Sequence, residues 1–211
     1  PVATVGLLQP VVNPVFDTYS VEATTPLKGV TAILLETLAD ASLPKNGPGR
    51  WGQTGNFILD ELVATAVTGP GSTPVAVEFQ RATADWEQDG YPAAHAIDRN
   101  PRTGWAIGPQ FGRPNYLIAE LKSPVGAGSE TRFTFRLEQN HGNNHTIGRM
   151  RISVTDETDS TLLRPLPEGM AELLRVSAAD RTEAQRRQVA AHFRAISPGL
   201  RNLEREIFRL N

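Results

Sequence analysis

Apolar and polar residues alternate along short segments through the first three quarters of the chain. In residues 131–138, for example, Phe133, Phe135 and Leu137 share one parity, and charged or hydroxyl-bearing side chains occupy the other. A period of two is typical of a β-strand with one face in the core. Residues 30–38 are apolar almost throughout, which favours a more fully buried strand. On these grounds the segments predicted to be strands are 17–25, 30–38, 56–67, 75–86, 94–97, 116–121, 131–138 and 146–155.

The spacing of these strands predicts the fold class. Most of the 18 Gly and 16 Pro residues fall in the turns between them. Short strands separated by such turns favour a mainly β fold, here a jelly-roll β-sandwich over residues 1–164. The segment 68–74 (TGPGSTP) is the best linker candidate. The strands therefore form either one sandwich or two related half-domains joined near 68–74.

From Pro165 onward the apolar residues recur at helical spacing. Thr182 and Gln185 fit a capping box, and Pro198 is well placed in the first turn of a further helix. We therefore expect a helical tail over 165–211 that leads into a continuation of the chain. The apolar positions of the predicted helices are Met170, Leu173 and Leu174, then Val189, Phe193 and Ile196, then Leu200, Leu203, Ile207 and Leu210.

Composition excludes several classes of function. A net charge of −2 gives no electrostatic case for nucleic acid. No apolar run approaches the roughly 18 residues of a membrane-spanning helix. The absence of cysteine excludes disulfides, thiolate zinc sites and haem attachment, so we expect no haem in this chain. Because the chain begins at Pro1 without Met, we interpret it as part of a longer protein.

The residues that carry most enzymatic chemistry do not form a catalytic motif. His141 and His145 are four residues apart, but they lie in a Gly- and Asn-rich loop and not on the helix that the zinc-protease motif needs. No Gly-x-Ser-x-Gly elbow and no phosphate-binding glycine loop occurs. The carboxylates Asp85 and Glu87 lie in a predicted turn, where solvation is the ordinary interpretation. We therefore expect a protein that is not an enzyme.

The stretch 94–105 offers oxygen ligands in a tight loop. Asp98, Asn100 and Thr103 are close in sequence, and calcium prefers six to eight oxygens from such a flexible loop. Glu61, which falls on the mainly apolar parity of its predicted strand, would add a second carboxylate. Alternatively, Asp98 bonds the backbone amides of its own loop in an Asx-type turn. The residues alone leave both interpretations open.

The same stretch resembles a known family signature. Ala96-Ile-Asp98-x-Asn100-Pro-x-Thr103-Gly-Trp105 is similar to the Ala-Ile-Asp-Gly-Asn-x-x-Thr-x-Trp signature of discoidin-like domains, also called coagulation-factor type C or galactose-binding-like domains. The resemblance implies a galactose-binding-like sandwich in which this loop helps to bind a structural calcium. The segment 56–64 resembles the strand that supplies the acidic ligand, here Glu61. Arg99 stands where the family has glycine, and Glu61 precedes the loop, which implies a rearranged strand order or two half-domains.

A second resemblance covers nearly the whole chain. The chain is similar to the segment between the conserved domains of planctomycete-type cytochrome c proteins, which implies an exported, periplasmic or cell-surface protein. Their haem domain lies upstream, and polysaccharide handling is suspected. The matching motifs are Asp17-Thr-Tyr19, Gly47-Pro-Gly-Arg50, Gly55-Asn-Phe57, Thr103-Gly-Trp105, His145-Thr-Ile-Gly-Arg149, Leu166-Pro-Glu and Arg181-Thr-Glu.

These resemblances imply a sugar site built from loops at one end of the sandwich. Such sites combine aromatic stacking with a few polar side chains. Trp105 is expected in the core instead, and Arg149 and Arg151 on a solvated strand face. The loop residues that suit sugar binding are Arg50, Trp51, Trp86, Phe111, Arg113, Asn143, Asn144 and His145.

Two functions remain open at this point. The first is a non-catalytic carbohydrate-binding module of a larger exported protein, with a structural calcium held by Asp98, Asn100, Thr103 and Glu61. Its partners would be a polysaccharide or glycan and the other domains of the parent chain. The alternative is a structural or docking module that spaces a cytochrome c domain from its partners and binds no small ligand.

Overall fold

The computed structural model describes residues 3–8, 13–69, 71–126, 130–166 and 169–196. The chain divides into two compact units, residues 1–163 and residues 164–211. The strands of the first unit are β1 (Ala3–Leu8), β2 (Asp17–Thr25), β3 (Val30–Thr37), β4 (Ile58–Leu59), β5 (Glu61–Val67), β6 (Val75–Ala76), β7 (Phe79–Ala84), β8 (Trp105–Ala106), β9 (Asn115–Val125), β10 (Thr131–Gln139) and β11 (Arg149–Thr155).

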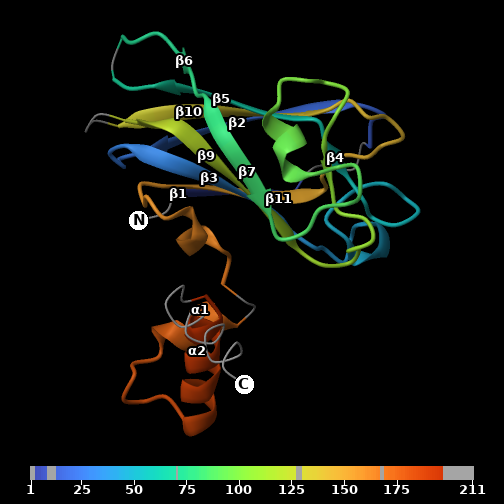
Figure 1. Cartoon of the computed structure of the whole chain (residues 1–211). Coiled ribbons are helices and arrows are strands. Elements are labelled where there is room, and N and C mark those ends of the chain that lie inside the picture. The colour runs from blue at the N-terminus through green and yellow to red at the C-terminus, as the bar shows by residue number, and fades with distance from the viewer. Residues whose placement is uncertain (1–2, 9–12, 70, 127–129, 167–168, 197–211) are drawn as a thin grey trace, which may run out of the picture. The chain divides into compact units, whose positions relative to one another are not determined.

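The first unit is a β-sandwich of two antiparallel sheets (Figure 1). The larger sheet has the strand order β1-β11-β3-β9-β7 and the smaller has the order β2-β10-β5-β6, while β4 pairs with β8. The chain repeatedly crosses from one sheet to the other, so most neighbours within a sheet are distant in sequence. The predicted mainly β sandwich is therefore confirmed.

Strand register brings the long loops together at one end of the sandwich. Gln139 at the end of β10 pairs with Asp17 at the start of β2, and Thr37 at the end of β3 pairs with Asn115 at the start of β9. The segments 13–16, 38–57, 85–114 and 140–148 therefore leave or enter the sheets at the same end, which we call the loop end (Figure 1).

The core lies between the sheets and follows the predicted alternation. Phe133, Phe135 and Leu137 are buried on β10, and the residues between them are not. Trp105 is fully buried, as expected, and its ring meets that of Phe57 edge to face at 5.1 Å. Trp105 directly follows the loop 98–104, so its burial fixes the end of this loop against the core.

Two predictions about connecting segments are wrong. Residues 94–97 do not form a strand but lie in the 3-10 helix η2 (Ala93–Ile97), because Ala93 and Ala96 are buried at a spacing of three. The segment 68–74 does not join two half-domains. It connects β5 to its hairpin partner β6, and both sheets mix strands from before and after it.

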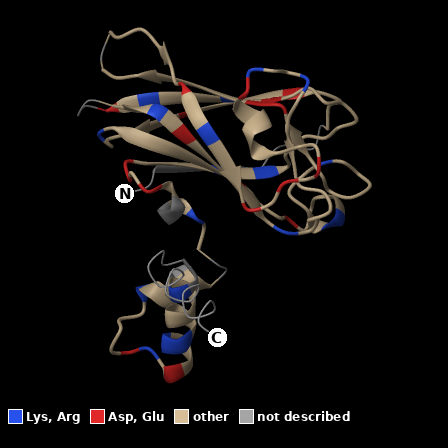
Figure 2. Ribbon diagram, viewed as in Figure 1, with Lys and Arg blue, Asp and Glu red and all other residues tan. Residues whose placement is uncertain are grey.

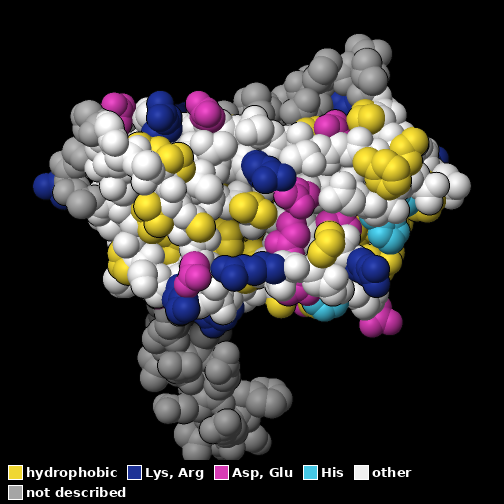
Figure 3. Space-filling view, turned by 90° about the horizontal axis from the view of Figure 1, so that it is seen from above, with side chains coloured by type: hydrophobic (Ala, Val, Ile, Leu, Met, Phe, Trp, Pro, Cys, Tyr) yellow, Lys and Arg dark blue, Asp and Glu magenta, His cyan; other side chains and the backbone are white. Residues whose placement is uncertain are grey.

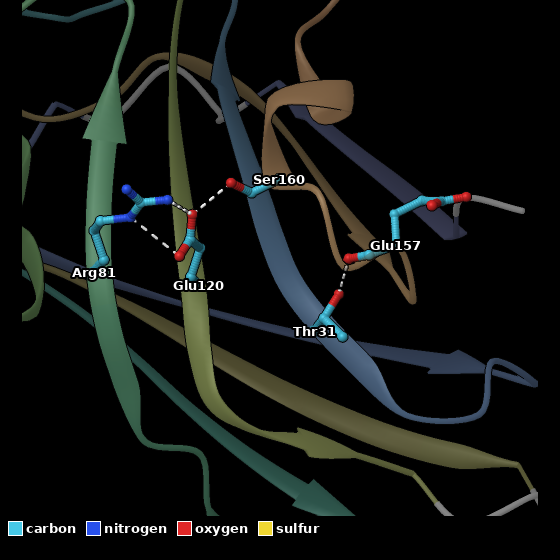
Figure 4. Close-up of polar contacts among 5 residues, drawn as sticks. All are labelled: Thr31, Arg81, Glu120, Glu157 and Ser160. Carbon is cyan, nitrogen blue, oxygen red and sulfur yellow. Dashed lines mark hydrogen bonds and ion pairs between the residues drawn. The ribbon is translucent and has the colours of Figure 1, made fainter. Parts of the chain in front are cut away.

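The outer face of the larger sheet carries ion pairs and contacts residues 157–163, the segment that follows β11. Ser160, in the 3-10 helix η3 (Ser160–Leu163), donates to Glu120 on β9, which also pairs with Arg81 on β7 (Figure 4). Thr31 on β3 donates to the backbone carbonyl of Glu157 (Figure 4). Leu163 packs on an apolar patch of the same face. These contacts fix the chain to the sandwich just before the second unit.

Basic and acidic residues occur on neighbouring strands (Figure 2), and several of their side chains form ion pairs. Arg149 pairs with Asp40 at 3.0 Å, and Arg151 pairs with the buried Glu36. Both arginines therefore lie on a partly solvated strand face that is crossed by ion pairs.

The second unit contains two short helices, α1 (Met170–Arg175) and α2 (Glu183–Ile196). The predicted capping box is confirmed. Thr182 N–H donates to Gln185 Oε1 (2.9 Å), and Gln185 N–H donates to Thr182 Oγ1 (3.3 Å). The helix predicted after Pro198 lies outside the described residues. Within the described part of the chain, neither helix has the length and apolar character needed to cross a membrane.

Candidate ligand-binding groove and cation site

A groove of about 780 Å³ lies at the loop end. Its walls come from segments that are distant in sequence: the loop after β3, the turn after β7 and the loop after β8. Hydrophobic and histidine side chains gather at this end of the sandwich (Figure 3). The residues that line the groove are Trp51, Asn56, Trp86, Glu87, Gln88, Asp89, Gly108, Pro109 and Phe111.

A small amide network forms the base of the groove. Gln88 Oε1 accepts hydrogen bonds from Asn56 Nδ2 (3.2 Å) and from the backbone N–H of Gly108 (3.0 Å). Asn56 Oδ1 in turn accepts the N–H of Ile107 (3.4 Å). A Cβ at Gly108 would lie 2.5 Å from Gln88 Oε1, so a larger residue there would have to displace the Gln88 side chain. The network holds three loops in one arrangement.

Both the side chain and the backbone of Trp86 are fixed by hydrogen bonds. Its indole N–H donates to the Gly108 carbonyl (3.2 Å), and its own carbonyl accepts the indole N–H of Trp105 (2.9 Å). The side chain nevertheless remains 36% exposed. A large apolar ring that is fixed in place and left open to solvent is the usual platform for stacking a ligand.

Trp51 belongs to a row of rings that runs along the loop end. It stacks on His145 (4.5 Å between centroids), and His145 meets His141, which in turn meets Tyr91. Burial lowers the pKa of His145, and nearby His141 lowers it further, while the Gly142 carbonyl opposes the shift. The imidazole beneath Trp51 is therefore neutral at neutral pH, and Trp51 is backed by a rigid partner.

The structure divides the predicted ligand residues into two sets. Trp51, Trp86 and Phe111 line the groove together, and His145 supports Trp51 from behind. The remaining residues lie outside the lining. Arg50 is buried, Arg113 is exposed near Asp85, Asn143 has a positive φ (52°), and Asn144 donates to the Asn13 carbonyl at 2.6 Å.

Sequence reasoning missed most of the polar lining of the groove. Asn56 was placed within a predicted strand, and Gln88 within a turn. Neither carries a motif, and only tertiary packing brings them together. The one available signal was the polar run 85–92 next to Trp86.

The predicted cation ligands lie together in a second cluster. Thr103 Oγ1 is 3.0 Å and 2.9 Å from the two carboxylate oxygens of Asp98, and 2.8 Å from the carbonyl oxygen of Asn100. Asp98 also accepts the N–H of Asn100 (2.9 Å), as in the Asx-turn alternative. The structure thus contains the Asx-type turn, with the side-chain oxygens of Asp98 and Thr103 next to each other.

Glu61 reaches this loop from the start of β5. Its side chain is only 5% exposed, and its Oε1 has no hydrogen-bond partner. Burial raises the pKa of Glu61 to about 7, and the neighbouring Asp98 carboxylate contributes to the shift while the N–H groups of Asn100 and Arg99 oppose it. Two carboxylates, a hydroxyl and a carbonyl are a donor set that calcium accepts.

The described residues contain no metal-binding cluster of the usual kind. Among the residues that the structure describes, no group of three or more His, Cys, Asp and Glu side chains is placed to hold a metal ion. The Glu61–Asp98 site has only two such side chains, so its other ligands would have to be neutral oxygens.

Comparisons with protein families, characterised proteins and solved structures found no match.

Proposed function

We propose that the chain is a non-catalytic carbohydrate-binding module of a larger exported protein, with a discoidin-like sandwich as its scaffold. One observation carries the proposal: three aromatic side chains from loops distant in sequence, Trp51, Trp86 and Phe111, line one open groove together with amide and carboxylate groups. Concave sites with an apolar surface and a few placed polar groups are typical of small-ligand sites.

The binding mechanism follows from these groups. An apolar sugar face stacks on the exposed part of Trp86, whose ring is held by its indole hydrogen bond and whose backbone is held by the Trp105 indole. Carboxylates of the groove then accept hydrogen bonds from sugar hydroxyls. Because Trp86 and the amide network are already ordered, binding costs little conformational entropy.

The proposal includes a structural calcium at the Glu61–Asp98 site. Asp98, Asn100 and Thr103 would hold it from the loop, and Glu61 from β5. The ion would replace the repulsion between two adjacent carboxylates with attraction to both. It would also fix the loop that leads into Trp105 and, through the Trp105 indole, the backbone of Trp86.

Binding to a glycan array and to affinity gels tests the proposed function. The Trp86→Ala variant should lose binding, and Trp86→Phe, which keeps a ring, should retain part of it. Val75→Ala is the matched control, because Val75 is an exposed apolar side chain on β6, away from the loop end. If the unmodified protein bound no glycan, the proposal would be wrong.

The docking alternative also has one observation in its favour. Thr31, Glu120 and the apolar patch under Leu163 fix residues 157–163 to the sandwich, so the chain leaves it at a defined point. A spacer between domains needs such a fixed exit. In that case Trp86→Ala would have no effect on the parent protein, whereas loosening the exit by Ser160→Ala with Leu163→Ala would alter the spacing of its domains in small-angle scattering.

A further inference from the structure

The charged side chains that line the groove are all negative. Among the residues that the structure describes, Glu87 and Asp89 are the acidic side chains of the lining, and no Lys or Arg belongs to it. The two arginines expected to bind a ligand are not among the described lining residues, since Arg50 is buried and Arg113 is exposed near Asp85. A ligand in this groove therefore meets a negative field.

Local structure fixes the Glu87 carboxylate and the backbone of Asp89. Glu87 Oε1 accepts the backbone N–H of Ala93 (2.9 Å), which fixes it at the start of η2. Asp89 is exposed and lies with Gly90 in a tight turn that is closed by the bond from Tyr91 N–H to the Gln88 carbonyl (2.8 Å). Neither carboxylate is paired with a basic side chain in any of the described ion pairs.

Part of the polar lining of the groove already bonds within the protein. The indole N–H of Trp86 and the side-chain amide of Asn56 donate to protein acceptors, and Gln88 Oε1 already accepts two hydrogen bonds. The carboxylates at the rim are hydrogen-bond acceptors only. A ligand that brings donors of its own therefore meets carboxylate acceptors at the rim, and a charged donor makes the stronger hydrogen bond.

We propose that the ligand of this groove is an amine-bearing glycan, a polymer of the glucosamine type, and that acidic polysaccharides are excluded. This inference rests on the proposed carbohydrate-binding function. The ammonium group bonds to Asp89 or Glu87 while the sugar ring stacks on Trp86. A uronate or sulfate at the same place would be repelled, since like charges brought together at an interface disfavour binding.

Affinity electrophoresis with three polysaccharides at mildly acidic pH tests the inference: chitosan, hydroxyethyl cellulose and polygalacturonate. We expect chitosan to bind about fivefold more tightly than the neutral polymer, as one exposed ion pair allows. Polygalacturonate should not bind. Asp89→Asn should remove most of the preference for chitosan, while Glu22→Gln, which neutralises an exposed carboxylate on β2, should change neither the preference nor the binding of the neutral polymer.

The possible failures are distinguishable. Equal binding of all three polymers, or tighter binding of polygalacturonate, would overturn the charge preference and leave carbohydrate binding standing. A chitosan preference that Asp89→Asn and Glu22→Gln weaken equally would show a non-specific charge effect and would also overturn it. If no polymer and no glycan of the array bound, the proposed function and this inference would fall together.

Discussion

Asp60 and Glu61 are neighbours in the chain, and each contacts a different loop at the same end of the sandwich. Asp60 Oδ2 accepts the backbone N–H groups of Asn140 (2.5 Å) and His141 (3.2 Å). Glu61 faces the loop 98–100. Both side chains are buried. Because successive side chains of an extended segment point to opposite sides, one dipeptide attaches two loops to the smaller sheet.

Replacing Asp60 should weaken the fold at the loop end. The Asp60→Ala substitution removes the acceptor of two part-buried backbone N–H groups, and losing hydrogen bonds to a charged acceptor costs about 1.5–3 kcal/mol. We therefore expect the free energy of unfolding, measured by urea denaturation, to fall by about 2 kcal/mol. The exposed Asp89→Ala serves as control and should have little effect. Equal losses in the two variants would contradict the role assigned to Asp60.

Glu61 should make stability depend on pH. In the unfolded chain this carboxyl titrates near 4.5, whereas burial, together with the Asp98 charge, raises its pKa in the native state to about 7. Between these values the native protein binds more protons than the unfolded chain, so stability falls as pH rises through the interval. We expect the melting temperature, measured with a chelator, to fall there more steeply than that of Glu61→Gln.

Calcium should reverse this pH dependence. A cation between the carboxylates replaces the shared proton, so added calcium should raise the melting temperature most at and above neutral pH, where Glu61 is ionised. The Glu61→Gln variant should lose most of that gain. If calcium left the melting temperature unchanged, the structural-cation proposal would be wrong, while the proton-linked prediction for Glu61 would still stand.

Much of the fold could be predicted from the sequence, because strands with one buried face leave a period of two. Phe133, Phe135 and Leu137 are predicted and observed in the core for that reason. The misassigned 94–97 segment is a short apolar run, and such runs do not distinguish a strand from a 3-10 turn. The pattern also did not predict β1, since the prolines that follow it obscure its limits.

The candidate site was harder to predict because its parts come from different loops. The grouping of Asp98, Asn100 and Thr103 could be predicted because they share one turn, and their family resemblance pointed to Glu61. The contact between Asn56 and Gln88 could not be predicted, since it depends on how two loops pack over the end of the sandwich. Arg50 suits ligand binding by residue type, and only the structure shows that it is buried.

The attachment of residues 157–163 should open locally when its apolar contact is removed. Leu163 is buried against Ala32, Leu34 and Ile118 on the outer face of the larger sheet. The Leu163→Ala substitution should expose this segment to proteolysis well before the sandwich unfolds, because local openings need less free energy than global unfolding. Mass spectrometry of early fragments identifies the cleavage site. Cleavage that began within the sandwich strands would contradict the prediction.

Gly108 should be required for the groove to keep its shape. A methyl group there would lie 2.5 Å from Gln88 Oε1 and 3.3 Å from the Phe111 ring, so the Gly108→Ala substitution must displace the amide network or the wall of the groove. Strain of this kind costs about 1–3 kcal/mol. We expect the affinity for glycan in affinity gels to fall by more than the loss of folded protein explains. The reason is that Trp86 donates to the Gly108 carbonyl, so a shift of Gly108 also moves the stacking ring. Gly52→Ala is the matched control, since a methyl group at Gly52 meets nothing within 4 Å. If both variants bound glycan like the unmodified protein, the groove would not be the binding site.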